Sequence, residues 1–272
     1  VCPLWLIAFI IVFLLAFNLS CIAANAPVDY PLHLAAKLGD SESIQVLLEC
    51  GHDINSRDQN GQTPLHCLVN HPNWDKEEDQ FHLLKAPNLK PSQKDYVSAI
   101  ELLLAKGAVI NAKDEKDNAT PLHLAARNGS YELTKCLVLK GAKLNEKTKL
   151  EKNTPLHCVG ISSYNYRINS QELNQVAKLL IKSGADLDAK DHFGFSPLHL
   201  FSSAGNLYVV KLLVESGAEV DLCSAYHGDY AEGGTPLAHS VLSNQSEVVK
   251  YLVSQGVEKK MFNSYGSRRG NH

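Results

Sequence analysis

The sequence lacks an excess of charge of either sign. Its 272 residues include 26 Lys and Arg against 29 Asp and Glu, which gives a formal net charge of -3 at pH 7. A protein that binds the phosphate backbone of nucleic acid through a basic groove carries a clear surplus of Lys and Arg. We therefore expect no nucleic acid among the partners of this chain.

The motifs of common nucleotide-binding and catalytic sites are missing too. The sequence has no P-loop, no G-x-S-x-G and no G-x-G-x-x-G, and no Cys-x-x-Cys pair completes a metal site around His66 and Cys67. We expect no catalytic residue, no metal and no cofactor. The cysteines after residue 26 are expected to be reduced thiols that pack as small apolar side chains.

Only the N-terminus has a long apolar run. From Val1 to Ala24 only Asn18 and Ser20 interrupt it. As a helix this stretch would rise about 36 Å, enough to cross a hydrocarbon layer about 30 Å thick. Ala24-Asn25-Ala26 has the form of a signal-peptide cleavage site, although no Lys or Arg precedes the run. Residues 1–26 are thus expected to be a membrane anchor or a cleaved signal, and the protein membrane-associated or secreted.

One short motif recurs six times along the chain. The clearest copy, residues 119–129, contains Thr120-Pro121-Leu122-His123. A Thr or Ser hydroxyl can cap the first turn of a helix, and Pro suits the next position because it has no N–H to leave unpaired. Each copy therefore predicts the start of a helix. The copies begin at Tyr30, Thr63, Thr120, Thr154, Ser196 and Thr235, of which the first and the last are degenerate.

A second signal follows about 20 residues later in the uninterrupted copies. Three apolar residues end three positions before a glycine, which can close a helix in the left-handed conformation. Each repeat is therefore predicted to contain two helices. The closing glycines are Gly51, Gly107, Gly141, Gly184, Gly217 and Gly256.

Together these signals resemble the ankyrin repeat family, whose T-P-L-H-x-A helix and G-A-D-x-N turn recur about every 33 residues. The segment Gly184-Ala185-Asp186-Leu187-Asp188 matches that turn. The resemblance covers about residues 29–257. It implies an all-α ankyrin-repeat solenoid of stacked helix-turn-helix units with hairpin-like fingers, here preceded by a hydrophobic N-terminal helix. It also implies that the motif histidines hydrogen-bond between neighbouring repeats, namely His33, His66, His123, His157 and His199.

The spacing of the motif prolines exceeds the repeat length in three places. Insertions are therefore expected at about 71–97, 160–171 and 223–234. For the last of them, a contact role and a plain extended loop stay equally open. Residues 258–272 are basic and polar and are expected to form a flexible tail.

The resemblance implies a non-catalytic, monomeric scaffold that binds another protein, and a membrane as well if the leader stays uncleaved. Two alternatives are a subunit of a secreted toxin or effector, and an enzyme that uses the 71–97 insertion. Partner contacts are expected on the fingers. The candidate residues are Arg57, Asp58, Gln59, Asn60, Asp114, Glu115, Lys116, Lys147, Lys149, Lys152, Asp191, His192, Phe193, Tyr226 and Tyr230.

Overall fold

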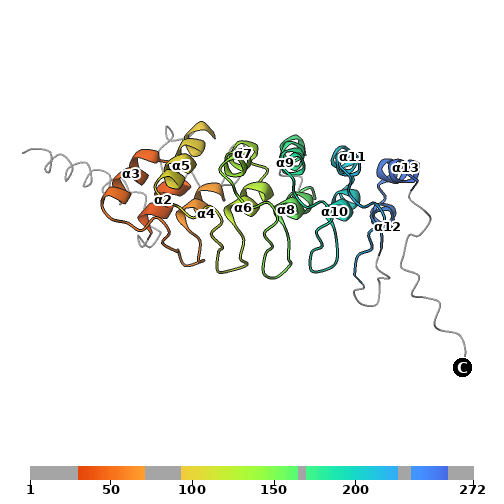
Figure 1. The fold of residues 1–272 in the computed structure, drawn as a ribbon, viewed down its shortest axis with the longest axis horizontal. Coiled ribbons are helices and arrows are strands. Elements are labelled where there is room, and N and C mark those ends of the chain that lie inside the picture. The colour runs from red at the N-terminus through yellow and green to blue at the C-terminus, as the bar shows by residue number, and fades with distance from the viewer. Residues whose placement is uncertain (1–29, 71–92, 165–169, 226–233, 257–272) are drawn as a thin grey trace, which may run out of the picture. The chain divides into compact units, whose positions relative to one another are not determined.

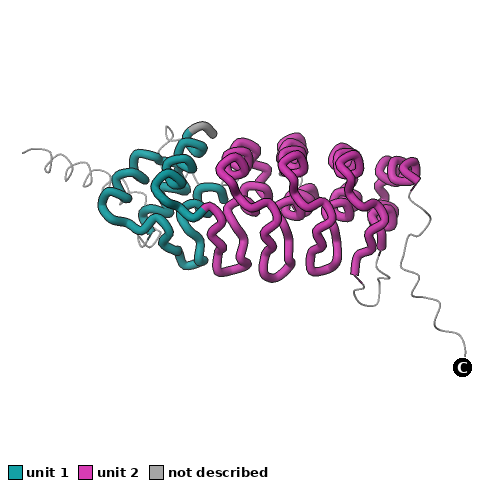
Figure 2. The backbone as a smooth tube through the Cα atoms, viewed as in Figure 1, with its two compact units in different colours: residues 1–109 teal, residues 110–272 magenta. Residues whose placement is uncertain are grey.

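A computed structural model describes residues 30–70, 93–164, 170–225 and 234–256. The chain divides into two compact units, residues 1–109 and residues 110–272 (Figure 2). The described ranges contain helices and no strand, as the resemblance implies. The predicted N-terminal helix in residues 1–26 and the predicted tail in residues 258–272 lie outside the described residues.

Unit 1 contains two helix pairs in its described residues. Helix α2 (Pro31–Lys37) pairs with α3 (Ser41–Glu49), and α4 (Pro64–Val69) pairs with α5 (Gln93–Ala105). The pairs stack because α2 packs on α4 and α3 packs on α5. Tyr96 on α5 is fully buried, and its hydroxyl donates a hydrogen bond of 3.0 Å to the carbonyl of Lys37. A polar bond thus ties the two pairs together inside their core.

Unit 2 contains four helix pairs in its described residues. The first helices α6, α8, α10 and α12 form one row, and the second helices α7, α9, α11 and α13 form the other (Figure 1). The loops that connect one pair to the next project as fingers on the side away from the second row (Figure 1). The pairs are α6 (Pro121–Arg127) with α7 (Tyr131–Leu139), α8 (Pro155–Ser162) with α9 (Ser170–Lys182), α10 (Pro197–Ser203) with α11 (Leu207–Glu215), and α12 (Pro236–Leu242) with α13 (Ser246–Ser254).

The Thr-Pro motifs start the first helices, as predicted. In α6 the N-cap Thr120 is extended, and the helix begins at Pro121. The next residue of each motif, a leucine, faces the core, and full burial of such a side chain stabilises the fold by roughly 1.5–3 kcal/mol. These leucines are at most 4% exposed in unit 2, namely Leu122, Leu156, Leu198 and Leu237.

The helices extend into the expected insertions. Helix α5 begins at Gln93, inside the first expected insertion. In the second, α8 continues to Ser162 and α9 already begins at Ser170. Helix α5 begins before the expected end of the insertion because its buried residues already follow the helical period there. These residues are Tyr96, Ala99, Ile100 and Leu103. Three segments of the insertions, 71–92, 165–169 and 226–233, lie outside the described ranges.

Candidate functional site

Each motif histidine of the complete copies closes the first turn of its helix. In α8, Nδ1 of His157 accepts hydrogen bonds from the backbone N–H of Thr154 at 3.3 Å and from the Thr154 hydroxyl at 2.8 Å. Because Nδ1 accepts, the ring carries its proton on Nε2. The same cap forms in α4, α6 and α10, with the histidines His66, His123 and His199.

The Nε2 proton then reaches the finger of the next repeat. Nε2 of His123 donates to the carbonyls of Glu146 and Asn153, both at 3.0 Å, on the two sides of one finger. The implied role in bonding between repeats is therefore confirmed for this histidine. The same contact joins other histidines to finger carbonyls, namely His33 to Ser56 and Gln62, His157 to Phe195, and His199 to Gly234.

The rings of His123, His157 and His199 are held neutral. Burial lowers the pKa of His157 to about 4 and that of His199 to about 3, and it lowers the pKa of His123 as well. Both nitrogens of each ring are already engaged in the scaffold. Within the described ranges, no three His, Cys, Asp or Glu side chains come together in a way that could hold a metal ion.

A second set of side chains joins the fingers to one another. Oδ1 of Asn145 accepts a hydrogen bond of 2.9 Å from the N–H of Asp186 in the following finger. These acceptors are the last residues of the G-A-x-x-N turns, to which the sequence alone assigned no role. The equivalent bonds run from the N–H of Val109 to Asn55, of Lys143 to Asn111, and of Glu219 to Asp188.

Three of the predicted contact residues form hydrogen bonds within their own fingers. Oδ1 of Asp114 accepts hydrogen bonds from the N–H groups of Asp117 and Ala119, both at 3.0 Å. The same pair of bonds closes the fingers at Asp58 and Asp191. Asp114 is 6% exposed and Asp191 is 9% exposed, so a partner has little access to these carboxylates. Their oxygens close the tip of each finger, and a partner contact at these three residues stays a prediction.

The other described candidates are exposed. Arg57 is held at its own tip, because its guanidinium donates to the carbonyl of Gly61 at 2.6 Å. Lys147 donates to the carbonyl of Lys190 in the next finger at 2.9 Å. Tyr226 and Tyr230 lie outside the described residues. The remaining exposed candidates are Gln59, Asn60, Glu115, Lys116, Lys149, Lys152, His192 and Phe193.

Backbone bonds bring the tips of unit 2 together. The N–H of Lys149 donates to the carbonyl of Asp117 at 2.6 Å, and the N–H of His192 donates to the carbonyl of Glu151 at 2.7 Å. Leu150 lies between these bonds and is 65% exposed. Sequence analysis missed Leu150, although an apolar residue among lysines at a finger tip was a signal that could have identified it.

One ion-pair cluster links two fingers of unit 2. The carboxylate of Glu146 lies 2.6 Å from Nζ of Lys113 and 3.2 Å from Nζ of Lys143. Hydrogen bonds from these two lysines lower the pKa of Glu146. Because both lysines are well exposed, the pairs add at most about 1 kcal/mol each to stability. The charge of Glu146 is already balanced by these two lysines, so it does not reduce the positive charge of the other lysines nearby.

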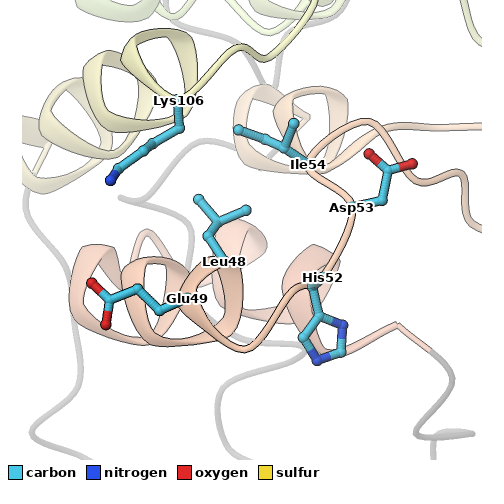
Figure 3. A pocket seen from close by; sticks show the side chains of 6 residues that line it. All are labelled: Leu48, Glu49, His52, Asp53, Ile54 and Lys106. Atoms are coloured by element: carbon cyan, nitrogen blue, oxygen red, sulfur yellow. The ribbon is translucent and has the colours of Figure 1, made fainter.

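A hollow opens in unit 1 between α3, the loop that follows it, and α5 (Figure 3). Leu48 and Ile54 supply its apolar lining. Asp53, at the rim, accepts a hydrogen bond from the N–H of Asn55 and so supports the turn. The lining of the hollow contains no Ser, Thr or Cys. The expected alternative of an enzyme built on residues 71–97 rests mainly on residues 71–92, outside the described ranges.

Capped helix pairs with fingers joined by histidine and Asn or Asp side chains define a repeat protein. A family model for ankyrin repeats matches residues 11–76, 91–168 and 165–263. The chain therefore belongs to the ankyrin repeat family, and the resemblance seen in the sequence is confirmed.

Two curated relatives are similar to this chain over different shares of their length. The human NF-kappa-B inhibitor zeta is 30% identical over 180 residues, which cover 62% of this chain and 25% of that protein. The probable 26S proteasome regulatory subunit p28 of Saccharomyces cerevisiae is 27% identical over 244 residues, which cover 88% of this chain and 91% of that protein. The chain thus spans about a quarter of the NF-kappa-B inhibitor and nearly all of p28.

The relatives also correct one expectation. Their names connect them with NF-kappa-B and the 26S proteasome, and none is named as a membrane or secreted protein. The prediction that this protein is membrane-associated or secreted is therefore wrong. It rested on the length and apolar composition of residues 1–26 and on the motif Ala24-Asn25-Ala26, which all lie outside the described ranges. Among the described helices, none combines the length and the hydropathy needed to span a bilayer.

Proposed function

We propose that this chain is a non-catalytic scaffold that binds another protein through its fingers, with residues 29–257 as its repeat domain. The observation that carries the proposal is the way the tips are held. Their backbones are fixed by bonds from neighbouring repeats, while many of their side chains remain exposed. A surface already ordered before binding loses less conformational entropy when a partner docks.

The proposed contact residues are the exposed candidates, and each unit contributes its own set. In unit 1 they are Arg57, Gln59 and Asn60. In unit 2 they are Glu115, Lys116, Lys147, Lys149, Lys152, His192 and Phe193, together with Tyr226 and Tyr230 of the third insertion.

The names of the relatives support a regulatory role. One is named as an inhibitor of NF-kappa-B, and the other as a regulatory subunit of the 26S proteasome. Both names describe an action on another protein rather than a chemical reaction. We therefore infer that this chain, as a monomer, regulates a protein or protein assembly by occupying part of its surface.

Site-directed photo-crosslinking in cells tests this proposal. A crosslinking amino acid at Lys116, on a finger, should capture a discrete protein, and excess unlabelled chain should compete for it. The matched control places the same amino acid at Lys178, an exposed position on α9 in the row away from the fingers. Capture at Lys178 but not at Lys116, or capture that excess chain does not reduce, would show that the fingers are not the binding surface.

A further inference from the structure

One finger tip of unit 2 differs in charge from the tip before it. Residues 147–152 read Lys-Thr-Lys-Leu-Glu-Lys, with three lysines and one glutamate around the exposed Leu150. The equivalent tip at residues 113–118 reads Lys-Asp-Glu-Lys-Asp-Asn, with more acids than lysines. The tip at 147–152 is thus a basic surface with an apolar residue at its centre.

Carboxylates near this tip are already engaged. Oδ1 of Asp117 accepts a hydrogen bond of 2.8 Å from the N–H of Leu150, and Oε2 of Glu151 accepts one of 2.7 Å from the side-chain amide of Asn153. Across the part of the chain that the structure describes, neither Lys149 nor Lys152 forms an ion pair. Their ammonium groups are therefore available to carboxylates of another molecule.

The backbone of Lys152 supplies an independent observation. Lys152 has a φ of 56°, in the left-handed region that costs most residues about 1 kcal/mol or more. The equivalent position in other fingers holds Gly61, Asn118 or Gly194, the residue types that enter this region most readily. Residues kept in such conformations concentrate at functional sites, where the side chain serves a purpose other than stability. We therefore attribute the lysine at this strained position to the function of its side chain.

The tip is also held in place on both sides. The N–H of Lys149 is bonded to the finger before it, and the carbonyl of Glu151 is bonded to the finger after it. Leu150 is therefore presented on a fixed backbone, so binding orders little more than its side chain.

We propose that residues 147–152 bind an acidic polypeptide segment that carries a large apolar side chain. Leu150 contacts the apolar side chain, and Lys149 and Lys152 pair with the carboxylates that flank it. This inference rests on the proposed function, because it names the chemistry of the partner. A polypeptide fits better than nucleic acid or an anionic membrane, because the acids Glu115 and Glu151 interrupt the lysines and would repel a continuous run of phosphates.

An array of random-sequence peptides, probed with the full chain, tests the proposal. The bound peptides should be rich in Asp and Glu and should contain Leu, Ile, Phe or Trp. Lys152→Gly should weaken binding to these peptides about fivefold, the range expected for one ion pair at a surface. The same substitution relieves the left-handed strain and should raise Tm by about 2 to 4 °C, so weaker binding would not reflect misfolding.

Asn118→Gly is the matched control, because Asn118 has a φ of 54° at the equivalent position of the preceding finger. It should leave peptide binding unchanged. The proposal is overturned if no peptide binds above background, if the bound peptides are neutral or basic, or if Lys152→Gly binds them as well as the parent chain. Binding of RNA or of phosphatidylserine vesicles that Lys152→Gly abolishes, with no preference among peptides, would overturn it as well.

The crosslinking experiment separates this inference from the proposed function. Continued capture of a protein at Lys116, together with an array that shows no acidic preference, would refute the partner chemistry and leave the scaffold function standing. Failure of both experiments would refute both.

Discussion

Lowering the pH should unfold the repeats by protonating their buried histidines. His157 and His199 are at most 1% exposed, and in each ring Nδ1 accepts bonds from the helix cap while Nε2 donates to the next finger. A proton on Nδ1 would turn that acceptor into a donor and would place a charge in the core. The folded protein therefore resists protonation at both sites, whereas the unfolded chain does not.

The size of the effect follows from the pKa differences. An unfolded histidine titrates near about 6.5, and His157 in the folded protein titrates at about 4. At about 1.4 kcal/mol per unit, this difference makes the folded state about 3 kcal/mol less stable at low pH than at neutral pH. His199, with a pKa of about 3, contributes about 5 kcal/mol by the same reasoning. The stability is fully present above about pH 6.5 and declines as the pH falls toward these values.

Urea unfolding followed by circular dichroism, from about pH 7.5 to about pH 4.5, measures this loss. Near pH 5 the two histidines together should remove about 4 kcal/mol, a large part of the roughly 5–15 kcal/mol by which whole domains are stable. His157→Gln should reduce the slope of stability against pH by about 1 kcal/mol per unit near pH 5. Leu156→Val, the control, should lower stability at every pH without changing that slope. An unchanged slope in His157→Gln would refute the assignment of the proton uptake to this ring.

Three further substitutions test the fingers of unit 2. Gly194→Ala should cost about 3 kcal/mol in thermal unfolding, because φ is 78° and the new Cβ would lie 2.4 Å from the nitrogen of Ala225. Gly184→Ala, with a φ of 91° and no atom within 4 Å of the new Cβ, should cost only about 1 kcal/mol, and equal losses would contradict the argument. Asn145→Ala should cost about 1 kcal/mol and should speed hydrogen exchange at the Asp186 amide, which loses its acceptor; unchanged protection there would rule out the bond.

The helical scaffold follows from local chemistry and was therefore predictable. Thr154 and Pro155 specify the start of α8 whatever surrounds them, because the cap and the fixed φ act within one turn. At the other end, Gly141 and Gly184 take φ values of 89° and 91° after the helices that they close. In α5 the sequence was less informative. Its first residues belong to an expected insertion, and the burial of Tyr96 depends on contacts with a helix much earlier in the chain.

The candidate surface was only partly predictable, because exposure depends on contacts distant in sequence. Asp114 and Lys116 both look like polar loop residues in one dimension. They differ in the structure because the backbone N–H groups of Asp117 and Ala119 converge on the Asp114 carboxylate. The equivalent positions of Asp58 and Asp191 in other repeats were the signal for this role. A short polar side chain that recurs at one place in successive turns is typical of a bond to the backbone two or more residues ahead.

Different residues of a finger fix its position and contact a partner, so stability and binding should respond to different mutations. The bonds that position a finger come from the histidine of the preceding helix, from the Asn or Asp of the neighbouring turn, and from backbone groups. Exposed tip side chains such as Lys149 and Leu150 take no part in these bonds, so replacing them should alter binding at little cost in stability. Lys152 is the exception, because its conformation makes the native side chain the less stable choice. Lys152→Gly should weaken peptide binding and raise stability, whereas Asn118→Gly should change stability alone. That pair of results would show that the strain at Lys152 serves recognition.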